Sequence, residues 1–95
     1  MNNIQIRHEA LNDVDRERFR QDEKWGGSTT DDNWTALDWH EMISDYNGWA
    51  RRMAAMGSLD KARRRYVQVA ALAVAAVESI DRIQSQETAE GDKQP

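Results

Sequence analysis

The longest apolar stretch of the chain runs from Tyr66 to Val77, where Gln68 is the only polar residue. A segment that is apolar on all sides has to be covered by neighbouring elements. It is too short to cross a bilayer, which takes about 20 residues. The pattern therefore predicts a buried central helix over residues 58–83, with Ser58 as its N-cap and Gly57 breaking the chain just before it.

The stretch before Gly57 also has helical spacing. Its apolar positions are 4, 3, 4 and 3 residues apart: Trp39, Ile43, Tyr46, Ala50 and Met53. Such a row packs along a partner helix, so a second helix is predicted over residues 35–56. A turn as short as the one at Gly57 makes the two helices an antiparallel hairpin.

A charged segment over residues 8–24 completes the predicted fold. It has few apolar residues, so this helix must pack on another element. Residues 25–33 are a predicted loop, and residues 1–6 a frayed lead-in. The prediction is an all-α fold: a three-helix unit built on a long antiparallel hairpin, with residues 1–84 as one domain and residues 85–95 as a disordered polar tail.

Composition narrows the class of protein. A chain of 95 residues makes one domain with a modest core, which favours a homo-oligomer. There is no cysteine, so disulfides and thiolate metal sites are excluded. The sequence shows neither a signal peptide nor an apolar run long enough for a membrane span, which predicts a cytoplasmic protein without a membrane partner.

The net charge of −4 conceals an uneven distribution. Between Arg51 and Arg65 there are six basic residues and one acidic residue, a net of +5, so the remainder carries −9. The molecule as a whole should repel nucleic acid, whereas this patch can attract a small anion. Arginine forks suit phosphate, and aromatic rings can stack on a base. The predicted ligand-binding residues are Arg51, Arg52, Arg63, Arg64, Arg65, Trp49 and Tyr66. The alternative is a solvated surface with ion pairs between subunits.

Carboxylates gather at the other end of the predicted hairpin. Asp38 and Glu41 are three residues apart on one helix, and Glu78 and Asp81 are three apart on the next. Residues at i and i+3 share one side of a helix, so two facing pairs would offer the oxygen ligands that Mg²⁺ takes. The competing interpretation, exposed carboxylates paired with arginines, is the one we favour, so no metal site is predicted.

Several segments resemble a family of small tailed-phage and prophage proteins. The segments are ERFRQDEKWG at residues 17–26, Asp31-Asp32, GWAR at residues 48–51, VQVAA at residues 67–71 and IDR at residues 80–82. Some members are similar to MazG-type all-α nucleoside triphosphate pyrophosphohydrolases, which work as oligomers of helical hairpins. These enzymes hold Mg²⁺ through acidic motifs on two helices.

The resemblance places those acidic motifs on residues that are mostly not acids. The first motif falls on Ser44, Asp45 and Gly48, and the second on Arg65 and Gln68. Only Asp45 is a carboxylate, and hard cations need several oxygen anions. The resemblance therefore implies the fold of these enzymes without their metal-binding site.

Together these features predict a non-catalytic phage protein in the cytoplasm of an infected host. It would bind a phosphate-bearing small molecule such as a nucleotide, without a cofactor, and could sequester a host immune signal. One alternative is a protein-interaction module that inhibits or recruits a host protein through Trp25, Trp34 and Trp49, since tryptophan and arginine dominate interface hot spots. A second alternative is a Mg²⁺-dependent pyrophosphohydrolase using the four carboxylates. The ligand, the oligomer size and the host stay open.

Overall fold

The computed structural model describes residues 1–92, with side chains as far as Thr88. It contains four helices: α1 (Asn3–Trp25), α2 (Ser28–Asp31), α3 (Ala36–Ala55) and α4 (Leu59–Asp92). No strand occurs among these residues, so the all-α prediction is confirmed.

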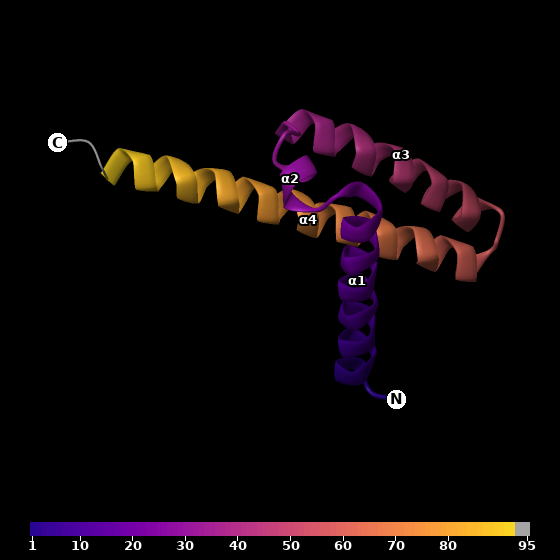
Figure 1. Cartoon of the computed structure of the whole chain (residues 1–95). Coiled ribbons are helices and arrows are strands. Elements are labelled where there is room, and N and C mark those ends of the chain that lie inside the picture. The colour runs from indigo at the N-terminus through magenta and orange to yellow at the C-terminus, as the bar shows by residue number, and fades with distance from the viewer. Residues whose placement is uncertain (93–95) are drawn as a thin grey trace.

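Helix α4 is the common partner of the other helices. Figure 1 shows α3 beside the first part of α4, running back toward the turn that joins the two helices. Helix α1 meets α4 at a steep angle, and its N-terminal half projects away from the rest of the chain (Figure 1). The molecule is accordingly elongated, with extents of 59 × 30 × 20 Å.

Capping side chains fix where the helices begin. At α1, the Asn2 side chain accepts a hydrogen bond from the Gln5 amide (2.8 Å), and the Gln5 side chain accepts one from the Asn2 amide (3.0 Å). This capping box starts the helix at Asn3, so the predicted frayed lead-in over residues 1–6 is wrong. Thr35 and Asp38 form the same reciprocal pair at the start of α3.

The C-terminal end of α4 also differs from the prediction. The helix continues past residue 83 to Asp92, so the tail predicted as disordered over residues 85–95 has helical backbone as far as Asp92. Residues 93–95 lie outside the described part of the chain. Glutamine, glutamate and alanine in this stretch tolerate the helix, and the first strong breaker is Gly91.

The core lies where α3, α4 and the loop tryptophans meet. Trp39, Leu72 and Ala75 are buried, and partly buried side chains pack around them: Trp25, Trp34, Met42, Ile43, Tyr46 and Ala76. Within one chain, α4 is covered only in part. Tyr66, Val74 and Val77 are exposed, because the neighbouring helices of one chain leave a side of α4 uncovered.

Candidate functional site

The structure distributes the predicted ligand-binding residues over different surfaces. Arg51 and Arg52 are exposed on α3. Arg63 donates a hydrogen bond to Asp13 of α1 (Nη2 to Oδ2, 2.7 Å). Tyr66 lines an apolar groove between α1 and α4. These residues therefore do not converge on one ligand, and only part of the predicted cluster forms a site.

Two of the predicted arginines, Arg64 and Arg65, line a shared groove between α3 and α4. We call it the basic groove; it is about 380 Å³ in volume and is lined by Met53, Lys61, Arg64, Arg65 and Gln68. Positions 61, 64, 65 and 68 of α4 stand three or four residues apart, so helical geometry places them on one side. Lys61 and Gln68 were not among the predicted ligand-binding residues, although their spacing from Arg64 and Arg65 is visible in the sequence.

The charges of the basic groove lack anionic partners among the described side chains. Among side chains as far as Thr88, no carboxylate lies within ion-pair distance of Lys61, Arg64 or Arg65. Other arginines of the chain are paired: Arg18 with Asp22 and Glu78, and Arg82 with Asp32. The basic groove therefore presents three cations that have no carboxylate partner among the described side chains and are open to a ligand.

Arg65 is held in place from two directions. Its guanidinium carbon lies 5.0 Å from the centroid of the Trp49 ring, and its Nη1 donates to Gln68 Oε1 at 3.1 Å. Trp49 in turn packs on Tyr46, with ring centroids 4.8 Å apart. The cation–π interaction between Trp49 and the Arg65 guanidinium contributes about 0.5–1 kcal/mol at an exposed site. Arg65 therefore covers one surface of the Trp49 ring. This changes the predicted role of Trp49 as a platform for a base.

The four carboxylates of the hydrolase alternative have other partners or none. Glu78 accepts from Arg18 (Nε to Oε1, 3.1 Å; Nη2 to Oε2, 3.3 Å). Asp38 caps α3, while Glu41 and Asp81 are exposed. In the part of the chain that the structure describes, no three His, Asp or Glu side chains gather as a metal site requires. Asp38 and Glu41 line one groove with Asp45, but neither Glu78 nor Asp81 lines it, so the two predicted pairs do not meet in one pocket.

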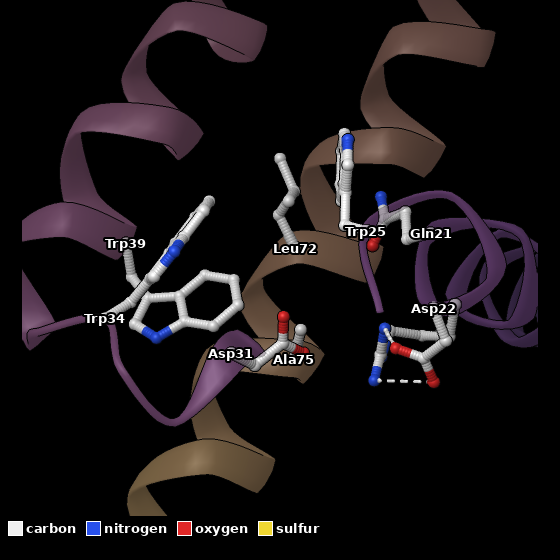
Figure 2. Close-up of a pocket in the computed structure, with 9 residues that line it drawn as sticks. Gln21, Asp22, Trp25, Asp31, Trp34, Trp39, Leu72 and Ala75 are labelled. Atoms are coloured by element: carbon white, nitrogen blue, oxygen red, sulfur yellow. Dashed lines mark hydrogen bonds and ion pairs between the residues drawn. The ribbon is translucent and has the colours of Figure 1, made fainter. Parts of the chain in front are cut away.

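A second, much smaller cavity lies among α1, α2, α3 and α4, and Figure 2 shows its lining. Its volume is about 10 Å³, room for a single water molecule. Its lining combines three tryptophans with polar side chains: Arg18, Gln21, Asp22, Trp25, Asp31, Trp34, Trp39, Leu72 and Ala75. Trp39 Nε1 and Gln21 Oε1 are buried there without a hydrogen-bond partner.

Two adjacent aspartates near this cavity have opposite electrostatic environments. Asp31 is 6% exposed, and burial, followed by repulsion from Asp22, raises the pKa of its carboxyl group. Asp32 accepts from Arg82 (2.8–3.1 Å) and from Ser79 Oγ (2.9 Å). The Arg82 hydrogen bond, followed by that of Ser79, lowers the pKa of Asp32. These contacts attach the α2 segment to α4.

The tryptophans near the loop are less available than sequence analysis expected. Trp25 and Trp34 are half-buried and pack against the core, and the Trp34 and Trp39 ring centroids are 4.7 Å apart. Of the three tryptophans proposed for a protein interface, Trp25 and Trp34 are thus half-buried, whereas Trp49 is 38% exposed. The clustering of Trp25 and Trp34 depends on the path of residues 25–35, which periodicity does not predict.

In comparisons with protein-family models, curated proteins and solved structures, nothing matches the chain. None of the described helices is both long and apolar enough to cross a membrane. The function is therefore argued from the geometry of the basic groove.

Proposed function

We propose that this protein is a non-catalytic binder of a small phosphate-bearing molecule, held in the basic groove. One observation carries the proposal: Lys61, Arg64 and Arg65 line one groove, and no carboxylate among the described side chains pairs with them. Like charges placed together repel, and an anion that binds between them removes that repulsion.

The other residues of the basic groove suit a ligand with a phosphate and an organic part. Arginine offers a planar fork to phosphate oxygens, and lysine a compact positive charge. Met53 supplies an adaptable apolar wall for a sugar or base. The volume of about 380 Å³ falls within the range of about 300–1,000 Å³ typical of small-molecule sites, so a mononucleotide is the proposed ligand class.

The lining of the basic groove favours binding over turnover. It contains no carboxylate and no histidine, so it offers neither a general base nor a ligand for Mg²⁺. A binder that does not hydrolyse its ligand removes that ligand from solution. Sequestration of a nucleotide signal in an infected cell is the proposed use, and this part rests on the phage resemblance.

The test is a panel of phosphate, pyrophosphate, and linear and cyclic nucleotides, screened by thermal shift and measured by calorimetry at low ionic strength. At least one ligand should raise the melting temperature, and added salt should weaken its binding. Arg64→Ala and Arg65→Ala should each weaken binding about tenfold, since a hydrogen bond to a charged group contributes about 1.5–3 kcal/mol. Arg52→Ala, an exposed arginine outside the basic groove, is the matched control and should bind normally.

Three results would overturn the proposal. The first is the absence of stabilisation by every ligand in the panel at low salt. The second is an equal loss of affinity in Arg52→Ala and Arg64→Ala, which would indicate attraction to the general positive charge rather than to this groove. The third is release of phosphate or pyrophosphate from a bound nucleotide, which would contradict the non-catalytic assignment.

A further inference from the structure

An uncovered row of apolar residues runs along α4. We call it the outer seam, and its positions are separated by 7, 4, 3, 4 and 3 residues: Leu59, Tyr66, Ala70, Ala73, Val77 and Ile80. This alternation of three and four keeps every member on one side of the helix and is the spacing of a helix that packs along another helix. The outer seam spans about 32 Å at about 1.5 Å per residue.

Most of the outer seam is left uncovered by the described residues of its own chain. Leu59 is 76% exposed, Tyr66 49%, Val77 57% and Ile80 39%. Helix α3 packs on another side of α4, around Leu72, and α1 contacts α4 at Glu78. The residues Ala10 and Val14 of α1 border only the first half of the seam. Single exposed apolar residues are ordinary, whereas a continuous row across six turns marks an interaction surface.

The N-terminal half of the outer seam opens into an apolar groove beside α1. This groove has a volume of about 410 Å³, and its lining is almost entirely apolar: Ala10, Val14, Leu59, Ala62, Arg63, Tyr66, Val67 and Ala70. Because Leu59, Tyr66 and Ala70 belong to both features, the groove and the seam form one surface. A helix laid along the seam would also contact α1.

We propose that the occupant is a second copy of this chain, with the two α4 helices packed antiparallel along their outer seams. The spacing of the seam is self-complementary. A two-fold axis midway between Ala70 and Ala73 places Ala70 opposite the partner's Ala73 and Tyr66 opposite the partner's Val77. The two alanines at the centre allow the helices to approach closely, and the larger side chains pack on either side.

Charge complementarity selects a copy of this chain in that orientation. Beside the outer seam, α4 carries Arg63 near its start and Asp81 near the other end of the seam, and Asp81 has no ion-pair partner among the described side chains. Antiparallel packing brings Arg63 of each copy, which already contacts Asp13 of its own α1, beside the partner's Asp81. Arg63 and the partner's Asp81 then lie at one level to within about 1.5 Å, one residue of helix rise. Parallel packing would instead bring like charges together.

The arm of α1 adds an independent reason for a partner. Residues 3–12 of α1 are all exposed, including Ile4, Ile6 and Leu11, and in Figure 1 this part of the helix projects away from the chain. An isolated helix of this length is marginal in water. A second copy on the outer seam would lie beside this arm and offer its apolar residues a surface.

Disulfide trapping tests the orientation directly, because the chain contains no cysteine of its own. A mixture of Tyr66→Cys and Val77→Cys proteins should form a cross-linked heterodimer under mild oxidation. Each variant alone should not cross-link, since two copies of position 66, or of position 77, lie about 16 Å apart along the axis. If each variant instead forms a cross-linked homodimer, and the mixture forms no cross-linked heterodimer, the two helices pack in parallel and the proposal is overturned.

Sedimentation equilibrium tests the surface. The native chain should behave as a dimer, and Val77→Glu should be monomeric with unchanged helix content by circular dichroism. Leu37→Glu is the matched control: Leu37 is 66% exposed on α3, away from the outer seam, and this variant should stay dimeric. A native chain that is monomeric up to millimolar concentration would refute the proposal. The partner of the outer seam would then be a different protein. The inference is independent of the basic groove, so Arg64→Ala should also stay dimeric.

Discussion

Leu72 is the residue on which the core of this domain depends most directly. It is 1% exposed, belongs to α4, and packs with Trp39 of α3, with Trp25 at the end of α1 and with Trp34 just before α3. Leu72→Ala should therefore weaken the attachment of α3 and of the loop to α4 in one step. We expect this substitution to be among the most destabilising single changes in the chain.

The magnitude follows from the atoms removed. Three carbon atoms at about 0.8 kcal/mol each give about 2.4 kcal/mol of lost transfer free energy. The rigid indole rings around the site can close the space only in part, and the new void joins the existing cavity of about 10 Å³. With the contribution of this void included, Leu72→Ala should lower the free energy of unfolding by about 3–4 kcal/mol. A domain of this length has about 5–14 kcal/mol in total, so the variant should fold but with a much reduced margin.

Urea unfolding at a fixed protein concentration measures the loss, followed by tryptophan fluorescence and circular dichroism together. The midpoint should fall while the slope with denaturant stays unchanged. Leu37→Ala, at a leucine that is 66% exposed, should cost less than about 0.5 kcal/mol. A loss below about 1 kcal/mol for Leu72→Ala, or one equal to that of Leu37→Ala, would show that the core is not centred on Leu72.

Two further predictions concern the segment between α1 and α3. Because folding raises the pKa of Asp31, this residue stabilises the folded state when its carboxyl group is protonated, below its pKa in the unfolded chain. That contribution to the free energy of unfolding is lost as the pH rises through the pKa of Asp31 in the folded state. Asp31→Asn should therefore raise the urea midpoint at neutral pH, and the gain should shrink in acid. The lowered pKa of Asp32 has the opposite sign: its contribution is present above its unfolded pKa and is lost as pH falls through the folded pKa. Asp32→Asn should thus be destabilising at neutral pH only, and equal pH profiles for the two variants would contradict both assignments. Gly26 has a φ of +94°, and an added Cβ would lie 2.7 Å from Thr30 Oγ1, so Gly26→Ala should cost at least about 1–2 kcal/mol in thermal unfolding. Gly48→Ala, whose Cβ would meet nothing within 4 Å inside α3, should gain about 0.5–1 kcal/mol, and a gain at Gly26 would refute the strain argument.

The regular helices could be predicted because their signals are local. Periodic apolar residues before and after Gly57 place α3 and the start of α4 within about one residue of the structure, the margin that helix ends allow. The start of α1 was missed although the capping pair Asn2 and Gln5 is also local. The first turns of α1 have only a weak apolar stripe, so apolar spacing predicted the helix from residue 8 and not from Asn3.

The site could be predicted only in part because side-chain partners depend on how helices cross. Helical spacing alone separates Arg63 from the Lys61, Arg64 and Arg65 group, so this division was accessible from the sequence. The stacking of Arg65 on Trp49 depends on the register between α3 and α4. The uncovered side of α4 was missed for a similar reason: an apolar run does not reveal how many helices of its own chain reach it.

The order of the helices along the chain has a consequence for synthesis. Helix α1 and helix α3 both pack mainly on α4, which is the last of the three to be translated. Neither can bury its apolar side when it leaves the ribosome, since Leu72 and Ala75 have not yet emerged. Tertiary structure therefore forms late and nearly all at once, after the middle of α4 is free. Until then, the nascent chain exposes its tryptophans, and chaperones that hold apolar segments have their main opportunity during that interval.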